Sequence, residues 1–483
     1  MSATQPVPFI GGTYLSRSRN FDCARAVNFY PEASGSGQSK SIAMLVGTPG
    51  TVLLSTLAGG GVRGSIPFTA TQAIVVVGGN VYSATTAGVG TLIGTIINRT
   101  TPVSMASNGI TIMLVTGPEG YVVTPNTAPA LSTVVQITDP AFTGADKVDY
   151  ADGYFVFNKP GTGQFQITGL LANTIDPLDF ATSEGSPDLL ISLLVNQREV
   201  WMFNTGTTEV FFDSGNADFP FERIQGAFME QGCAAKNSPA KLNETVLWLS
   251  SDDRGQGMVV KANGYRPQRI STHAEEFAWS QYARIDDAVG YSYQQEGHTF
   301  YVLTFPTGNA TWVYDDNTQL WHERAWRNPV DASLNRHRSN CMMAFGGKII
   351  VGDWENGNLY SLSLDAYTDN GAILPAIRQA PHFATADNTW MIFDRFWVDM
   401  ETGVGLATGQ GSDPMVMISW SDDGGHTFPN EVMVSAGPIG KYRARAIVRR
   451  VGKSRDRVWR VTITDPVKRI LIGAGATVRQ CAA

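Results

Sequence analysis

The sequence predicts an all-β protein built around a β-propeller of about six or seven blades. Glycine is abundant at 50 residues, charged residues make up only 16%, and aromatic residues are frequent; short strands joined by glycine-rich turns produce this composition. Apolar strand-like runs recur with their leading strands roughly 35–50 residues apart, which is the period of propeller blades. Helical spacing is rare and extends over one or two turns at residues 274–284.

The first 40 residues are predicted to form an extended arm. They lack sustained periodicity, and Pro6, Pro8 and the run Ala33-Ser34-Gly35-Ser36-Gly37 favour an extended chain. The propeller is then expected over residues 41–365, where short apolar strands alternate with turns. The groups of strands expected in the blades are 73–77 with 81–82, 110–115 with 121–123, 147–150 with 154–157, 189–195 with 200–203 and 210–212, 246–249 with 258–261, 291–293 with 299–305 and 311–314, and 342–345 with 348–351 and 359–362.

Residues 366–483 are predicted to form a small C-terminal β-domain. The blade rhythm stops at residues 366–390, where Asp369-Asn370-Gly371 and Pro375 indicate loops. Strand-like runs then resume without the blade spacing, at residues 390–401, 415–420, 444–451 and 457–464. The alternative is that this segment supplies the last blade of the propeller.

A hairpin motif lies within this last segment. Ser421, Asp423, Gly425, Thr427 and Phe428 have the spacing of the Asp box, a β-hairpin signature of propeller proteins. Sialidases repeat this box several times, whereas one good copy occurs in this chain. Because Asp side chains hydrogen-bond nearby backbone amides and Gly accepts positive φ, we expect Asp422 and Asp423 to cap a turn and to carry no catalysis.

Positive charge gathers near the C-terminus. Residues 441–483 contain twelve Lys and Arg against two Asp, so this segment has a charge of +10 and the other 440 residues carry −17. Such asymmetry favours docking onto an acidic partner or another subunit; binding to nucleic acid and a merely solvated strand face are the alternatives. The candidate assembly residues are Arg445, Arg449, Arg450, Arg455 and Arg457.

No motif predicts a catalytic, cofactor or metal site. Residues 59–64 fit the glycine-rich dinucleotide pattern formally, but Pro67 leads into a strand, so no helix follows to hold a phosphate. His322-Glu323 begins like a zinc-protease motif, but Trp326 stands at the second ligand position. No run of 18 apolar residues occurs, so no membrane span is expected.

Several short stretches occur in a distinctive order along the chain. The strongest are Glu401-Thr402-Gly403, Trp420 to Phe428, Gly452-Lys453-Ser454-Arg455-Asp456-Arg457-Val458-Trp459-Arg460 and Asp465-Pro466-Val467. The others are Asn28-Phe29-Tyr30-Pro31-Glu32 and residues 47–50, 230–233, 248–249, 269–272, 297–301, 314–315 and 321–324. Together they resemble the phage packaged-DNA stabilisation proteins of the P22 tail hub (nozzle) type. Their order and spacing over some 440 residues carry the resemblance, and Phe428 departs from it where Trp is commoner.

The resemblance implies a non-enzymatic virion protein of the phage tail, assembled in the host cytoplasm. Such a hub is expected to be a homo-oligomer, a hexamer, below the portal and its head-to-tail adaptor ring. It would carry a tailspike or tail fibre at its side and a tail needle or plug at its tip. Double-stranded DNA would pass through its channel without sequence-specific binding. The alternative function is a carbohydrate-binding or sialidase-like propeller.

Overall fold

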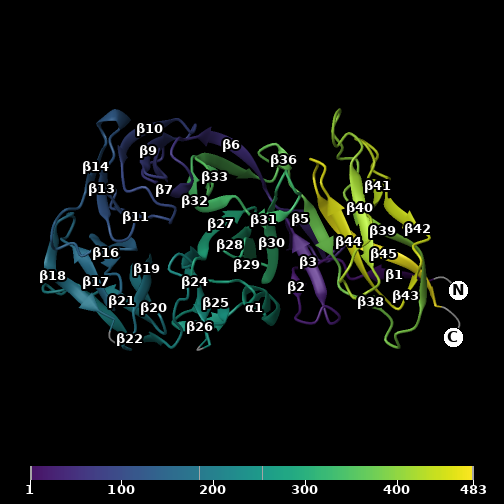
Figure 1. Ribbon diagram of the computed structural model, residues 1–483, viewed down its shortest axis with the longest axis horizontal. Helices are drawn as coiled ribbons and strands as arrows, with labels where there is room; N and C mark the ends of the chain where they lie inside the picture. The colour runs from purple at the N-terminus through teal and green to yellow at the C-terminus, as the bar shows by residue number, and fades with distance from the viewer. Residues whose placement is uncertain (1–2, 184, 253, 481–483) are drawn as a thin grey trace.

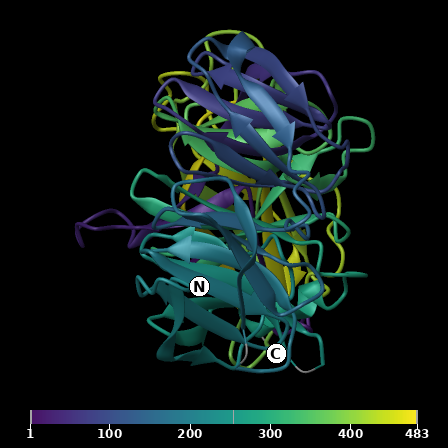
Figure 2. The ribbon, with the colours of Figure 1, turned by 90° about the vertical axis from the view of Figure 1, so that its left-hand side faces the viewer.

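The computed structural model describes residues 3–183, 185–252 and 254–480. Its longest axis runs from a β-propeller at one end to a β-sandwich at the other (Figure 1). Figure 2 looks onto the propeller end, with the yellow C-terminal strands of the sandwich behind it. The all-β fold class is therefore confirmed, as is a C-terminal β-domain distinct from the blades.

Six blades consist of four consecutive antiparallel strands each. The first three are β7 (Val62–Pro67), β8 (Gln72–Val77), β9 (Asn80–Thr85) and β10 (Gly90–Thr95); β11 (Ser104–Ser107), β12 (Ile112–Val115), β13 (Gly120–Thr124) and β14 (Thr133–Gln136); β15 (Val148–Ala151), β16 (Tyr154–Asn158), β17 (Gln164–Thr168) and β18 (Ile175–Thr182). The next three are β19 (Leu190–Asn196), β20 (Glu199–Asn204), β21 (Thr208–Asp213) and β22 (Phe221–Met229); β23 (Ala240–Leu242), β24 (Thr245–Ser251), β25 (Gly257–Asn263) and β26 (Arg266–Arg269); β27 (Val289–Gln295), β28 (His298–Phe305), β29 (Ala310–Asp315) and β30 (Leu320–Arg327).

A further sheet closes the ring and joins distant parts of the chain. It contains β32 (Ser339–Phe345), β33 (Lys348–Asp353) and β34 (Asn358–Ser363), and its fourth strand is β6 (Gly50–Thr56), which pairs antiparallel with β34. The short strands β35 (Thr368–Asp369) and β36 (Ala372–Ile373) extend this sheet. Because the first and last strands of the propeller are hydrogen-bonded together, the circle of blades has few free sheet edges.

The blades pack face to face, and this explains their sequence pattern. All residues of 73–77 are buried because both faces of β8 contact neighbouring sheets, so the strand is continuously apolar instead of alternating. Aromatic side chains such as Trp201 and Trp248 fill the wedge between blades, as expected from their positions in the sequence. The predicted helical turn is α1 (His273–Trp279), and the remaining small elements are the 3₁₀ turn η1 (Pro129–Leu131) and β31 (Leu334–Arg336), which pairs with β30.

The sandwich has two sheets. One runs in the order β4 (Phe29–Ala33), β5 (Ala43–Gly47), β45 (Ile470–Gln480), β39 (Met391–Met400) and β42 (Ala446–Arg449), with β1 (Ala3–Val7) on β45 and β43 (Lys453–Ser454) on β39. The other runs β3 (Cys23–Val27), β37 (Ala376–Gln379), β44 (Asp456–Ile463), β40 (Met415–Ser421) and β41 (Val432–Ser435), with β2 (Tyr14–Leu15) on β3 and β38 (Phe383–Ala384) on β44. In the core between them, Phe396 and Trp459 are stacked with ring centroids 3.9 Å apart.

The N-terminal residues expected to form an arm are extended, but they are hydrogen-bonded into both sheets of the sandwich. β3 also pairs with β30 of the propeller, so one continuous sheet joins the two parts. At this junction the buried Asn28 has φ +53°, donates to the carbonyls of Ala325 and Pro375, and accepts from the amide of Ala325. β3 and β4 have five residues each and are mostly buried, so they show no alternation and periodicity did not reveal them.

Candidate functional site

The outward face of the sandwich carries three arginines around one tryptophan. Side chains alternate along β39, so Phe396 and Val398 point into the core while Arg395 and Trp397 point outward. On β42, Arg449 lies directly opposite Arg395, and Ile447 lies opposite Trp397. The guanidinium groups of Arg395 and Arg445 lie 5.5 and 5.9 Å from the centre of the Trp397 ring. We call Arg395, Arg445, Arg449 and Trp397 the basic face.

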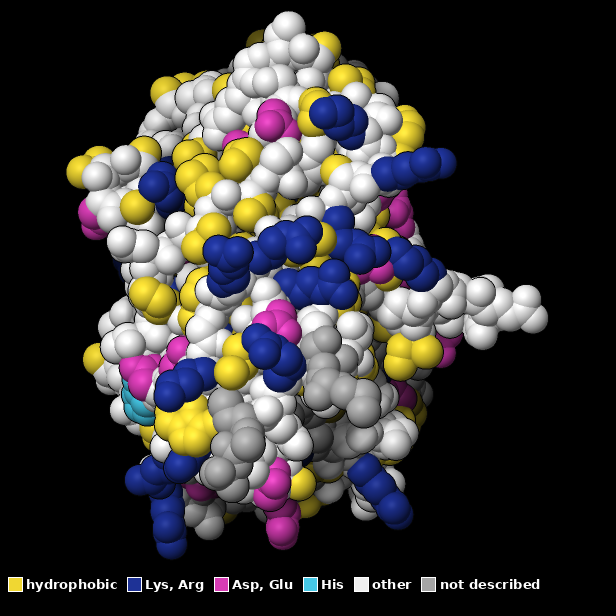
Figure 3. Space-filling model, turned by 90° about the vertical axis from the view of Figure 1, so that its right-hand side faces the viewer, with side chains coloured by type: hydrophobic (Ala, Val, Ile, Leu, Met, Phe, Trp, Pro, Cys, Tyr) yellow, Lys and Arg dark blue, Asp and Glu magenta, His cyan; other side chains and the backbone are white. Residues whose placement is uncertain are grey.

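The basic face has more positive charge than its surroundings neutralise. Arg395 donates to the hydroxyl of Thr477 at 2.7 Å, but among the described residues neither Arg445 nor Arg449 forms an ion pair with a carboxylate. The nearby carboxylates of Asp394 and Asp399 are held by Arg479 and Lys40. Figure 3 shows Lys and Arg side chains gathered in a band across this end of the molecule. Like charges directly opposite each other are unfavourable in an isolated sheet, so the arrangement suits an acidic partner.

A second basic group lies beside the first. Lys453 and Arg455 both approach the half-exposed Trp390, at 5.1 and 5.0 Å from its ring centre. Arg450 is exposed in the turn after β42, with φ +57°, and its amide donates to the carbonyl of Asp394. Four of the five arginines proposed from the sequence are therefore at the surface of the sandwich.

Arg457 is a correction to the predicted assembly residues. Its side chain is only 1% exposed, because it lies on the same face of β44 as Trp459, which packs in the core between the sheets. The guanidinium binds both carboxylate oxygens of Asp422 at 2.7 and 2.8 Å and donates to the carbonyl of Val451. The ring of Phe393 lies 4.3 Å from it. Arg457 thus stabilises the sandwich interior and is not available to a partner.

The hairpin motif forms a network around one carboxylate. Asp423 accepts hydrogen bonds from the Ser421 hydroxyl at 2.5 Å, from the amides of His426 and Thr427, and from the Thr427 hydroxyl at 2.5 Å. These donors hold the pKa of Asp423 well below its usual range, the Ser421 hydroxyl most of all. The Ser421 hydroxyl in turn accepts from the amide of Gly425. Asp422, which was expected to share the capping, instead forms the ion pair with Arg457.

Comparison with known protein families gives the same two parts, a propeller and a sandwich. A family model described as the β-propeller of bacteriophage P22 Gp10 matches residues 5–367, and one described as its β-sandwich matches residues 377–479. The chain belongs to the bacteriophage P22 Gp10 family. The Gp10 family is a family of phage structural proteins concerned with stabilising packaged DNA, so the resemblance seen in the sequence is confirmed.

Other comparisons add nothing to this assignment. No curated protein matches the sequence. Among solved structures, streptogramin B lyase is 11% identical with a TM-score of 0.43, covering 70% of this chain and 98% of that one. The N-terminal domain of Nup159 is 9% identical with a TM-score of 0.42, covering 70% and 99%. A putative 6-phosphogluconolactonase from Bacteroides fragilis is 14% identical with a TM-score of 0.41, covering 68% and 98%. Likenesses at this level carry no argument about function.

The position of the hairpin in this Gp10-family chain bears on the glycosidase hypothesis. The motif connects β40 to β41 in the sandwich, whereas the boxes of sialidases belong to propeller blades. A Cβ atom on Gly425 would lie 2.8 Å from the sulfur of Cys23, so the turn packs tightly against the N-terminal segment. The single copy therefore braces the sandwich and supplies no support for sugar chemistry.

The two other motifs considered from the sequence, His322-Glu323 and the glycine-rich residues 59–64, have structural roles. His322 is buried, and burial lowers its pKa to about 3, while Glu323 binds Arg25 at 2.6 and 2.7 Å. Gly61 begins the approach to β7, where a Cβ atom would clash with the carbonyl of Trp354. Within the part of the chain that the structure describes, no group of His, Cys, Asp and Glu could hold a metal ion, and no helix is long and apolar enough to cross a membrane.

Sequence reasoning missed Arg395 and Trp397, which complete the basic face. Both lie in the predicted strand 390–401, outside the counted basic segment. The alternation of Arg395, Trp397 and Asp399 with Phe396, Val398 and Met400 was the available signal, since it marks an exposed face that is charged and aromatic.

Proposed function

We propose that this chain is the structural tail hub, or nozzle, of a short-tailed phage. In this role it closes the portal channel, retains the packaged DNA and later forms the DNA exit channel. It acts in the virion tail, is assembled in the host cytoplasm, and performs no enzymatic reaction. The observation that carries the proposal is the match to the Gp10 family over both domains, in a chain whose sandwich ends in an exposed basic face.

The basic face is proposed as one side of a contact between subunits or with the adaptor ring. A closed ring needs two different patches on each subunit, because each copy meets its neighbour head to tail. The basic segment carries +10 and the rest of the chain −17, so a second copy has the excess negative charge that such a contact needs. We propose a hexamer, bound to the head-to-tail adaptor above, to a tailspike or tail fibre at the side, and to a needle or plug at the tip.

The DNA conduit is proposed to run between the copies, because the channel inside each propeller is obstructed. The segment before β23 reaches the inner strands of several blades. The carbonyl of Asn237 accepts from the amide of Gly290 at 2.8 Å, and Lys236 binds Asp146 at 3.0 Å and accepts from Ser192 through its carbonyl. An overall acidic surface favours such a conduit, since negative walls repel phosphates and give no sequence-specific binding.

The test is to produce phage particles without this chain and to complement them with plasmid-borne protein. We expect particles that lack it to lose packaged DNA and infectivity, and wild-type protein to restore both. DNA retention without the chain would overturn the proposal. A parallel assay with a fluorogenic sialoside is expected to show no turnover, and turnover would restore the carbohydrate-active alternative, which no described residue now favours.

A further inference from the structure

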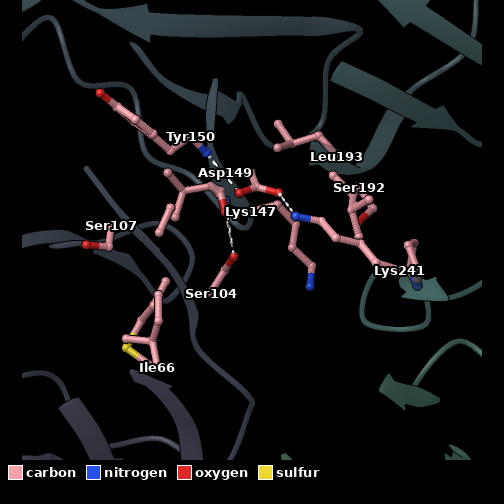
Figure 4. A pocket seen from close by; sticks show the side chains of 14 residues that line it. Ile66, Ser104, Ser107, Lys147, Asp149, Tyr150, Ser192, Leu193 and Lys241 are labelled. Atoms are coloured by element: carbon pink, nitrogen blue, oxygen red, sulfur yellow. Dashed lines mark hydrogen bonds and ion pairs between the residues drawn. The ribbon is translucent and has the colours of Figure 1, made fainter. Parts of the chain in front are cut away.

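The central channel of the propeller contains a pocket of about 450 Å³ lined by the inner strands of several blades. Its lining includes Ser104 from β11, Asp149 from β15, Ser192 from β19 and Lys241 from β23, together with Lys147 immediately before β15. A pocket of this size is typical of small-ligand sites, which often lie where elements converge. In Figure 4 the amino group of Lys147 points into the open space without a dashed line to a partner.

The charges around this pocket do not balance. Lys236 binds Asp146 at 3.0 Å, and Lys241 lies 3.8 Å from Asp149. The same Oδ2 atom of Asp149 accepts from the amide of Val195 at 2.7 Å, and its Oδ1 atom accepts from the amide of Tyr150 at 2.9 Å. Three lysines therefore share two carboxylates, and the ammonium group of Lys147 forms no hydrogen bond or ion pair with a described residue. A confined ammonium group without a counter-ion is costly, and burial lowers the pKa of Lys147 to about 8.

Arg63 is a further cation near the channel, and its guanidinium already has hydrogen-bond partners. Arg63 lines a neighbouring pocket that also reaches Lys147. Its guanidinium donates to the carbonyls of Thr101, Gly78 and Ile97 and to the hydroxyl of Thr116. Arg63 therefore stabilises loops between blades, and Lys147 is left as the cation free to bind a ligand in this part of the described structure.

We propose that Lys147 binds a small anion with a carboxylate or phosphate group in the central channel of the propeller. One negative group there balances the third lysine, and the pocket volume admits a metabolite-sized molecule. The site is independent of the basic face, which lies at the opposite end of the long axis of the molecule (Figure 1). The proposal goes beyond the tail-hub function and does not depend on it.

The test measures the accessibility of Lys147 in the purified full-length protein. Lysines are acetylated briefly with acetic anhydride at pH 8, with chloride, acetate, citrate or inorganic phosphate at equal ionic strength, and modification is quantified by mass spectrometry. Lys348, an exposed lysine on β33, is the internal control. We expect citrate or phosphate to slow labelling of Lys147 at least threefold and to leave Lys348 unchanged. Comparing the labelling rates of Lys147 in the carboxylate and phosphate solutions identifies which anionic group the site prefers.

A second measurement uses variants. Phosphate or citrate should raise the melting temperature of wild-type protein and of Lys348→Met, but not of Lys147→Met. Equal labelling of Lys147 in every salt would overturn the proposal, as would an anion-dependent shift that persists in Lys147→Met. If Lys147→Met does not fold, the labelling result for the wild-type protein decides alone.

Discussion

Arg395 and Arg449 lie directly opposite each other on β39 and β42, on the outward face of the sandwich. An isolated subunit gains nothing from two like charges at this position. Arg449→Glu should therefore raise the stability of the subunit slightly, by about 0.5 kcal/mol, because it creates an opposite-charge pair. The same change should block assembly onto the adaptor ring. Urea unfolding measures the first effect, and sedimentation with the adaptor measures the second.

The control for this variant is Lys348→Glu, which changes the same charge at the exposed first residue of β33 in the propeller. It should leave assembly intact. The extended reversal of Arg449, Arg450 and Arg455 should abolish ring formation completely. Normal rings with only slower DNA ejection would show that the basic face lines the lumen and is not an assembly surface.

Arg457 and Arg455 are two residues apart and offer a matched pair. Arg457→Met should cost about 2 kcal/mol in unfolding free energy, because the change removes the ion pair with the half-exposed Asp422 and leaves the carbonyl of Val451 unpaired. Arg455→Met removes only an exposed contact with Trp390 and should stay within about 0.5 kcal/mol of wild type. Chemical unfolding of both variants checks this, and equal costs would contradict the assignment of Arg457 to the interior.

Asp423→Ala should cost roughly 1 kcal/mol of stability and remove no activity, since the side chain is exposed and only its turn network is lost. The pKa of Asp423 is lowered in the folded state. Its contribution is thus present above the ordinary carboxyl pKa of about 4 and is lost as the pH falls below it. The stability gap to wild type should be constant near neutral pH and shrink in acid. His426→Ala, which keeps the backbone amide, is the control.

His382 ties the N-terminal segment to the sandwich. Its ring nitrogens contact Asp456 at 2.7 Å and the carbonyl of Arg19 at 2.7 Å, and the hydrogen bond with Asp456, followed by that with Cys23, raises its pKa to about 10. The stabilisation is full below the unfolded pKa of about 6.5 and is lost as the pH rises toward 10. His382→Gln should therefore flatten the decline in stability between these pH values. An unchanged slope in pH-dependent unfolding would contradict the charged state of His382.

Local sequence signals predicted most strands of the propeller. The strands that were missed or not assigned to a sheet pair with segments far away in the sequence. Apolar runs around glycine turns located β8 with β9 and β15 with β16, because each hairpin is complete within a short stretch. The strand β6 could not be assigned to the closing blade, since its partner β34 is some 300 residues away and no local pattern encodes that pairing. The N-terminal strands were missed for the same reason, as their partners lie in the C-terminal domain.

The candidate site was predicted only in part. Charge counting found the arginines but could not separate the buried Arg457 from the exposed Arg449 and Arg455. The face of the strand on which a side chain lies decides this, and which face is covered depends on how the two sheets pack. Charge counting missed Arg395 because it lies on β39, outside the basic segment. It belongs to the site because β39 pairs with β42.

A side-chain resolution reconstruction of the phage tail by electron cryo-microscopy tests the central claim most directly. It is expected to show six copies of this chain in a ring below the adaptor, with Arg395, Arg445 and Arg449 covered by a neighbouring copy or by the adaptor, and with DNA passing between the copies. A tail without this chain, or a ring in which the basic face is left open to solvent, would contradict the account.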